Sequence, residues 1–171
     1  HVYRRQGFDW NLETTLFPPD KPNTQAFGSE LATDGLSIVV TSSLENAVYI
    51  YHFDGTTWNL ESFLEPKDTK GQWAYGHDLA IDGDVAVVGD GEDNSNTCYI
   101  YRRMNNQWYE EAQLHDDENC WGFSYFKLDI DGDTIAIGGY CSPSLFVYDY
   151  SEESGWIRST LTGPPEYPVF D

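Results

Sequence analysis

Four tryptophans recur through this chain at nearly equal intervals, and no other feature restricts its fold as strongly. Trp10, Trp58, Trp108 and Trp156 are separated by 48, 50 and 48 residues. Each follows a run rich in aromatic and β-branched residues, and each precedes a leucine five or six residues later. A rare residue at a fixed period indicates a structural repeat, so we expect each tryptophan to pack at the same place in its own unit.

A second pattern repeats between the tryptophans. An aromatic residue and a glycine lead to a leucine run, an Asp-Gly pair and a β-branched run, and the three copies lie within residues 26–40, 75–89 and 121–138. Glycine after aspartate supplies the positive φ of a tight hairpin turn, which explains the Asp-Gly pair without any metal. The run Val85–Gly89 is apolar throughout, as in a strand buried on both faces.

Each period therefore predicts four short antiparallel strands, which is typical of a β-propeller blade. The fold class is all-β, with about three and a half blades. Residues 1–17 correspond to the outer two strands of one blade. Whole blades are predicted over 26–66, 73–115 and 120–162, and residues 167–171 begin another, with Phe170 at the aromatic position.

The motifs Phe27-Gly28, 79–84, 87–89 and 48–51, followed by Trp58, together resemble the FG-GAP repeat. That family includes the propeller head of integrin α chains, and this sequence is closer to the simpler secreted members. The resemblance implies an extracellular propeller, commonly of seven blades, that serves adhesion or ligand binding. Three and a half blades cannot close a ring. Either this is a segment of a larger propeller, which we favour, or another chain completes the ring.

The charge restricts the partners. With 29 acidic and nine basic residues the formal net charge is −20, which repels phosphate backbones and anionic membranes and excludes nucleic acid as a partner. No apolar stretch approaches the ~20 residues of a membrane span, so no membrane insertion is expected. The sequence opens at His1 without a methionine, as expected of a processed or partial chain.

One loop could bind calcium. It offers oxygen ligands from Asp90, Glu92, Asp93, Asn94 and Asn96, an arrangement suited to Ca²⁺, although an ordinary solvated loop would look the same. The Asp-Gly-Asp turns at 82–84 and 131–133 are too short for the calcium loop of integrin-type repeats, so they are expected to be structural.

The three cysteines suggest one disulfide. Cys120 precedes the first strand of its blade and Cys141 follows the second, so the hairpin brings them nearly opposite each other. A bridge there would stabilise by roughly 3 kcal/mol and would indicate an oxidising compartment. Cys98 is free, pairs with Cys120 instead, or links to another chain.

The expected binding surface is one rim of the blades. Trp73 and Trp121 stand at blade entrances, beside the acidic run Asp116, Asp117 and Glu118. The alternative is that these aromatics pack and that the acidic run is only solvated charge. Arg4-Arg5 and Arg102-Arg103 are expected to be exposed strand ends that discourage edge pairing.

The sequence shows no zinc-type histidine spacing and no nucleophile elbow, so no enzyme is predicted. We expect a secreted or cell-surface adhesion or assembly module that binds protein or glycan. A carbohydrate-binding propeller is the main alternative, and a hydrolase or lyase using paired carboxylates is a further one.

Overall fold

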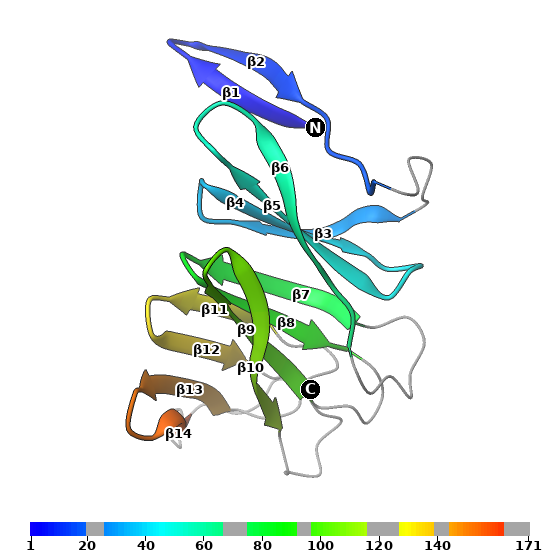
Figure 1. The fold of residues 1–171 in the computed structure, drawn as a ribbon. Coiled ribbons are helices and arrows are strands. Elements are labelled where there is room, and N and C mark those ends of the chain that lie inside the picture. The colour runs from blue at the N-terminus through cyan, green and yellow to red at the C-terminus, as the bar shows by residue number, and fades with distance from the viewer. Residues whose placement is uncertain (20–25, 67–74, 92–96, 116–126, 139–143, 163–171) are drawn as a thin grey trace, which may run out of the picture.

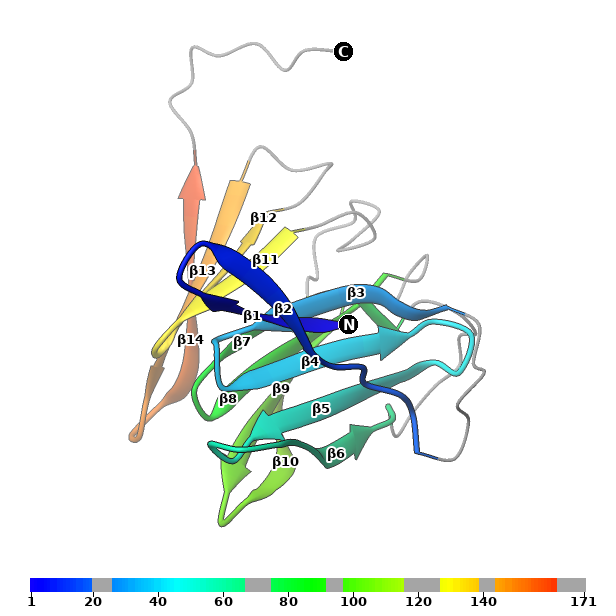
Figure 2. The ribbon, with the colours of Figure 1, turned by 90° about the horizontal axis from the view of Figure 1, so that it is seen from above.

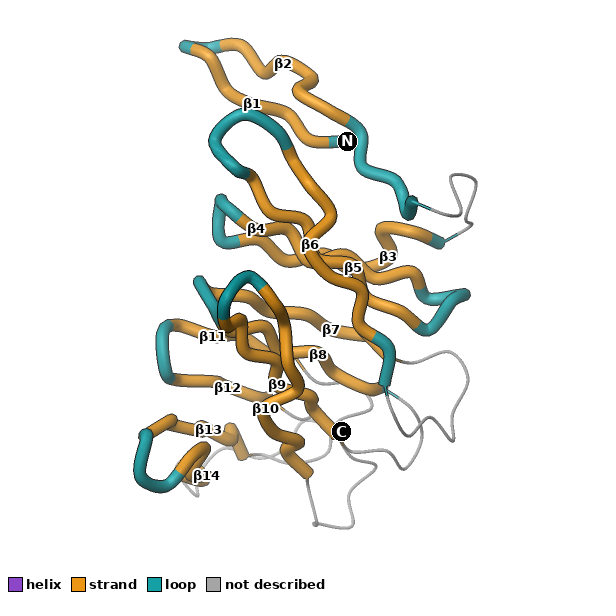
Figure 3. The backbone as a smooth tube through the Cα atoms, in the orientation of Figure 1, coloured by secondary structure: helices purple, strands orange, loops and turns teal. Residues whose placement is uncertain are grey.

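The computed structural model describes residues 1–19, 26–66, 75–91, 97–115, 127–138 and 144–162. Within these segments every regular element is a β-strand, and none is a helix (Figure 3). The described part of the chain therefore contains no helix that is long and apolar enough to cross a membrane. The predicted all-β class is confirmed.

The strands form four antiparallel sheets, each made of strands that follow one another in sequence. The first sheet has two strands and the second has four: β1 (Val2–Gln6) and β2 (Asp9–Thr14), then β3 (Phe27–Thr33), β4 (Ser37–Ser42), β5 (Ala47–Phe53) and β6 (Trp58–Leu64). The third and fourth sheets have four strands each: β7 (Tyr75–Asp82), β8 (Val85–Asp90), β9 (Thr97–Met104) and β10 (Gln107–His115), then β11 (Lys127–Asp131), β12 (Thr134–Gly138), β13 (Ser144–Ser151) and β14 (Gly155–Thr162).

The sheets are stacked in chain order, with the first sheet at one end (Figure 1). Their leading strands lie side by side, since β7 contacts both β3 and β11. Seen from above, the fourth sheet is turned relative to the second, as expected for successive blades around an axis (Figure 2). This is the arrangement of a partial β-propeller.

Glycine and asparagine form the hairpin turns at one end of the sheets. Gly83 and Gly132 have φ of +55° and +56°, and the Asn105-Asn106 pair has φ of +52° and +60°. The Asp34 carboxylate also accepts backbone hydrogen bonds from Leu36 and Ser37, at 2.8 and 2.6 Å. The Asp-Gly pairs therefore form turns, as the pattern predicted.

The core lies between the sheets. The second strand of each four-stranded sheet is largely buried, with Val39, Val87 and Ile135 fully inaccessible. The apolar clusters join neighbouring sheets: one combines side chains of the second and third sheets, and another combines the third and fourth. The sheets therefore depend on their neighbours for burial, as the units of a repeat protein do.

The glycine of the aromatic-Gly motif has a steric role in the third sheet. Gly76 has φ of +78°, and a Cβ built there would lie 2.6 Å from Thr41 Oγ1 and 2.9 Å from Val48 Cγ2. Gly28 has a similar φ of +88° but open space around it. Of these two described motif glycines, Gly76 is the one at which the close approach of two sheets demands glycine in addition to the backbone conformation.

Candidate functional site

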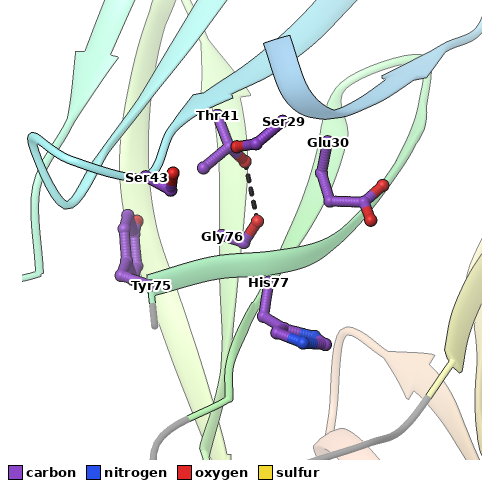
Figure 4. Close-up of a pocket in the computed structure, with 7 residues that line it drawn as sticks. All are labelled: Ser29, Glu30, Thr41, Ser43, Tyr75, Gly76 and His77. Atoms are coloured by element: carbon purple, nitrogen blue, oxygen red, sulfur yellow. Dashed lines mark hydrogen bonds between the residues drawn. The ribbon is translucent and has the colours of Figure 1, made fainter. Parts of the chain in front are cut away.

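A small polar pocket opens between the second and third sheets (Figure 4). Its volume is about 170 Å³, and it is lined by Ser29, Glu30, Thr41, Ser43, Tyr75, Gly76 and His77. These residues come from the start of β3, the end of β4 and the start of β7. The pocket therefore lies at the end of the sheets opposite the Asp-Gly turns.

The buried side of this pocket is held by hydrogen bonds between the two sheets. Thr41 Oγ1 donates to the Gly76 carbonyl oxygen at 2.7 Å, and the Tyr75 amide donates to Asn46 Oδ1 at 3.1 Å. Thr41 and Tyr75 are buried, whereas Ser29 and His77 are exposed. The pocket thus combines a fixed floor with accessible hydroxyl, carboxyl and imidazole groups.

The position of His77 depends on the glycine that follows β8. A Cβ built on Gly91 would lie 2.7 Å from His77 Cγ, so the imidazole packs against the Gly91 backbone. Glycine at position 91 therefore leaves the room that the His77 ring occupies, and the ring points away from the Thr41 side of β7 (Figure 4).

The deepest polar contact near this interface joins two tyrosines. The hydroxyls of Tyr75 and Tyr101 lie 2.7 Å apart, and both rings are buried. Burial raises the pKa of Tyr101 to about 12 and holds the pKa of Tyr75 well above its usual value. Both phenols therefore remain protonated at neutral pH and hold the sheet in place.

At the outer strands, the three repeat tryptophans that follow Trp10 each bind a glutamate of the preceding sheet. Trp108 Nε1 donates to Glu61 Oε2 at 3.0 Å, and Trp156 Nε1 donates to Glu111 Oε2 at 3.0 Å. Trp58 makes the same contact with Glu13 at 3.4 Å. These Trp–Glu contacts join all four sheets. Their signal was available in the sequence, because Glu13, Glu61 and Glu111 each lie three residues after a repeat tryptophan.

The same glutamates bind arginines. Arg4 Nε donates to Glu13 Oε1 at 2.8 Å, which lowers the pKa of Glu13, and Arg102 Nε donates to Glu111 Oε1 at 2.6 Å. Arg103 Nε donates to Glu61 Oε1 at 2.8 Å. The side chains of Arg102 and Arg103 are only 21% and 18% exposed. The prediction of exposed strand ends is therefore wrong for this pair, because Arg102 binds a glutamate on the adjacent strand β10 and Arg103 binds a glutamate on β6 of the preceding sheet.

The Asp-Gly turns also link the sheets. Gly83 N donates to Asp34 Oδ2 at 3.1 Å, and Gly132 N donates to Asp82 Oδ2 at 2.6 Å. The aspartate of one turn thus binds the glycine amide of the next. The sequence pattern predicts only the turns themselves, and the contact between turns depends on how the sheets stack.

Most residues predicted for the functional rim lie outside the described segments. These residues are Trp73, Glu92, Asp93, Asn94, Asn96, Asp116, Asp117, Glu118, Cys120, Trp121 and Cys141. Of the predicted calcium ligands, Asp90 is described, and it ends β8. In the described segments no group of three or more His, Cys, Asp or Glu residues is arranged to hold a metal. The calcium loop and the Cys120–Cys141 bridge remain predictions.

Cys98 is described, and its side chain is fully buried in β9. It forms no disulfide with another described residue. Burial raises the pKa of its thiol well above the usual value, with the nearby Asp78 and Asp90 adding to the effect. The environment of Cys98 is thus that of an inert core thiol.

Comparison with known proteins supports the fold. No protein-family model and no curated protein sequence matches the chain. Among solved structures, Saccharomyces cerevisiae Sqt1 aligns with 82% of this chain and 36% of its own, at 13% identity and a TM-score of 0.56. A functionally unknown protein from Desulfotomaculum acetoxidans DSM 771 aligns with 82% of this chain and 39% of its own, at 14% identity and a TM-score of 0.45. Myxococcus xanthus glutaminyl cyclase aligns with 70% of this chain and 46% of its own, at 12% identity and a TM-score of 0.40.

The chain spans less than half the length of each of these three structures. At 13% identity, the likeness to Sqt1 concerns the arrangement of sheets and not the activity. The chain is therefore similar in fold to part of a larger protein, and its FG-GAP character rests on the sequence resemblance.

Proposed function

We propose that this chain is a non-catalytic binding and assembly module of a secreted or cell-surface protein. It would present the pocket end of its sheets to a protein or glycan ligand. The observation that carries the proposal is the pocket itself, in which Ser29 and Glu30 lie beside a floor fixed by the Thr41–Gly76 hydrogen bond and His77 completes the lining. The extracellular location is supported by the repeat resemblance and by the acidic composition.

Binding is favoured over catalysis because the buried polar groups of the pocket are committed to structure. The Thr41 hydroxyl and the Tyr75 amide bond across the sheets, and the Tyr75 hydroxyl bonds to Tyr101. A rigid floor with a few exposed polar groups suits recognition of a small polar surface. The volume of about 170 Å³ is enough for one small polar group.

Carbohydrate is the favoured ligand class among the alternatives. Carboxylate, hydroxyl and imidazole groups pair well with the hydroxyls of a sugar, and the pocket offers all three. Protein ligands remain the second class, served by the same end of the sheets.

The proposal is tested with the full chain on a glycan array, followed by titration of the best ligand in an ¹⁵N NMR experiment. The expected result is shifts of the His77 and Ser29 amides. Glu30→Gln should weaken binding about tenfold, because a carboxylate acceptor is lost. Glu152→Gln, in an exposed turn at the opposite end, is the matched control and should leave affinity unchanged.

Two results would contradict the proposal. Equal binding by the parent and the Glu30→Gln variant would remove the pocket as the site. Turnover of a bound sugar, followed by product analysis, would remove the non-catalytic assignment and support the hydrolase or lyase alternative.

A further inference from the structure

The first sheet differs from the other three in the exposure of a tyrosine at one repeated position. Tyr51, Tyr101 and Tyr148 are each 4% exposed, whereas Tyr3 is 53% exposed. The four tyrosines occupy equivalent positions. In each sheet the repeat tryptophan pairs with a residue on the adjacent strand, and the tyrosine lies two residues before that residue. In the three four-stranded sheets a second strand lies beside this tyrosine, whereas the free edge of β1 has no such neighbour among the described strands.

The second sheet is exposed at the matching place. Leu31 is 61% exposed, while the equivalent Leu79 and Leu128 are 6% and 8% exposed. These leucines are equivalent because each pairs with the fourth residue of the following strand. The three partners are Val40, Val88 and Ile137. Leu79 and Leu128 are each covered by the four-stranded sheet that precedes their own. The sheet that precedes Leu31 has two described strands, β1 and β2, and leaves Leu31 exposed.

A cavity of about 470 Å³ lies between the two exposed surfaces. Its walls include Tyr3 and Leu16 on one side, and Phe27, Leu31, Ile38 and Val40 on the other. The cavity occupies the place that the first two strands take in each complete sheet. It is therefore shaped for a pair of strands and lined with the apolar side chains that such a pair would cover.

We propose that this open end binds a two-stranded β-hairpin of the same type as β7–β8, carried by a polypeptide segment outside residues 1–171. Among the described strands, every inner pair is already used within its own sheet, so these strands of a second copy offer no pair to donate. One strand of the hairpin would hydrogen-bond to the free edge of β1, as β4 does to β5 and β8 does to β9.

The chemistry of the hairpin follows from the intact interfaces. The second sheet contributes Ala32 and Val39 to the cluster that it shares with the third sheet, and these residues are cross-strand partners. The third sheet contributes Ala80 and Val87 in the same way. The partner hairpin therefore places an alanine on its first strand and a valine on its second strand against the cavity.

The turn of the partner hairpin has a looser requirement. Gly83 and Gly132 bond to an aspartate of the preceding turn, but the equivalent Gly35 donates to Thr33 Oγ1 at 3.1 Å. Thr33 stands where the later repeats have isoleucine, so the second sheet provides its own acceptor at this end. The partner's turn thus needs no aspartate for this contact.

The test uses a synthetic peptide with the sequence of residues 75–91, added to the full chain at moderate salt to screen the acidic charge. Isothermal titration calorimetry should give saturable one-to-one binding, and NMR should show protection of β1 amides with Ala86 of the peptide opposite Tyr3. A disulfide-constrained form of the peptide is tested in parallel, because an isolated hairpin is marginally stable.

Matched variants locate the binding. Leu31→Asp in the chain and Val87→Asp in the peptide should each weaken binding about tenfold or more, because each buries a carboxylate. Leu36→Asp is the control, since Leu36 is 58% exposed in the β3–β4 turn and does not line the cavity. Failure of both peptides to bind, or binding that Leu31→Asp leaves unchanged, would overturn the proposal. Glu30→Gln should not affect the peptide, which separates this result from the proposed function.

Discussion

Glu61 and Trp108 lie 47 residues apart in sequence and are joined by a 3.0 Å hydrogen bond from the indole nitrogen to the carboxylate. Arg103 donates to the other oxygen of the same carboxylate. At the other two interfaces the arginine lies in the same sheet as the glutamate, as Arg4 and Arg102 do. The second sheet has His52 at that position, and Arg103 of the third sheet supplies the charge instead. Each of the three interfaces thus keeps one Trp, one Glu and one Arg.

Removing the Glu61 carboxylate should destabilise the protein. Glu61→Ala leaves the buried Trp108 indole and the partly buried Arg103 without this acceptor, and we expect a loss of about 2 kcal/mol in the free energy of unfolding. Glu61→Gln keeps one acceptor oxygen and should lose about half as much. Urea unfolding monitored by tryptophan fluorescence measures both, with the exposed Glu153→Ala as the control. Equal stability of Glu61→Ala and the parent would show that the contact contributes nothing.

The aromatic-Gly motif allows the steric and conformational roles of glycine to be separated. Gly28→Ala should lower the free energy of unfolding by about 1 kcal/mol, because alanine at this position must adopt a left-handed backbone conformation. Gly76→Ala adds a clash with Thr41 and Val48, so its loss should exceed about 3 kcal/mol. Thermal unfolding of the two variants compares the costs directly. Similar losses would mean that the second and third sheets separate easily.

Asp78 joins the third and fourth sheets and is 6% exposed. Its Oδ2 accepts from the Leu128 amide at 2.8 Å, and its Oδ1 accepts from the exposed Lys127 at 3.2 Å. Asp78→Ala should cost about 2 kcal/mol, because the buried amide loses its partner. Lys127→Met should change stability little, because exposed ion pairs contribute little. A larger effect of Lys127→Met in urea unfolding would reverse this ranking.

Stability should fall at alkaline pH. Burial raises the pKa of Tyr101 to about 12 and holds that of Tyr75 well above its usual value, while an unfolded tyrosine ionises near its usual pKa of 10. The stabilisation is therefore complete below pH 10 and is lost as the pH rises toward 12. Urea midpoints across this range should decrease, and Tyr101→Phe should flatten the slope in part, since Tyr51 is also raised to about 12. Urea midpoints that stay unchanged between pH 10 and pH 12 would contradict this expectation.

The cysteines should differ in reactivity. Cys98 is fully buried with a raised thiol pKa, so it should react with a thiol reagent only after unfolding. The predicted Cys120–Cys141 bridge should appear in a non-reducing peptide map of the protein expressed under oxidising conditions. A map that joins Cys98 to either of the other cysteines would contradict both expectations.

Local pattern was enough to predict the strands and their turns. The run of residues 79–89 carries the leucine strand, the Asp-Gly turn and the buried valine strand within a few residues, and the structure confirms them as β7 and β8. Hairpin turns and alternation are local properties, so a repeat read along the chain reveals them. The predicted rim residues are a different case, because most of them lie in segments that the structure does not describe.

The environment of each repeat could not be read in the same way. Trp10 is 66% exposed and Trp108 is 9% exposed, although their sequence positions are equivalent. The difference depends on whether another sheet lies in front of the ring. The arginines were misjudged for the same reason, since Arg103 is held by a glutamate 42 residues earlier.

The amino-acid sequence by itself determined the period, the four-stranded unit and the positions of its turns, because these depend on side chains close together in the chain. The tertiary structure alone decided which of the equivalent residues are buried, which carboxylate binds which arginine and tryptophan, and where the array is open. These properties belong to contacts between sheets. Tyr3 and Tyr101 occupy the same position in their repeats, yet one is exposed and the other is covered by neighbouring strands.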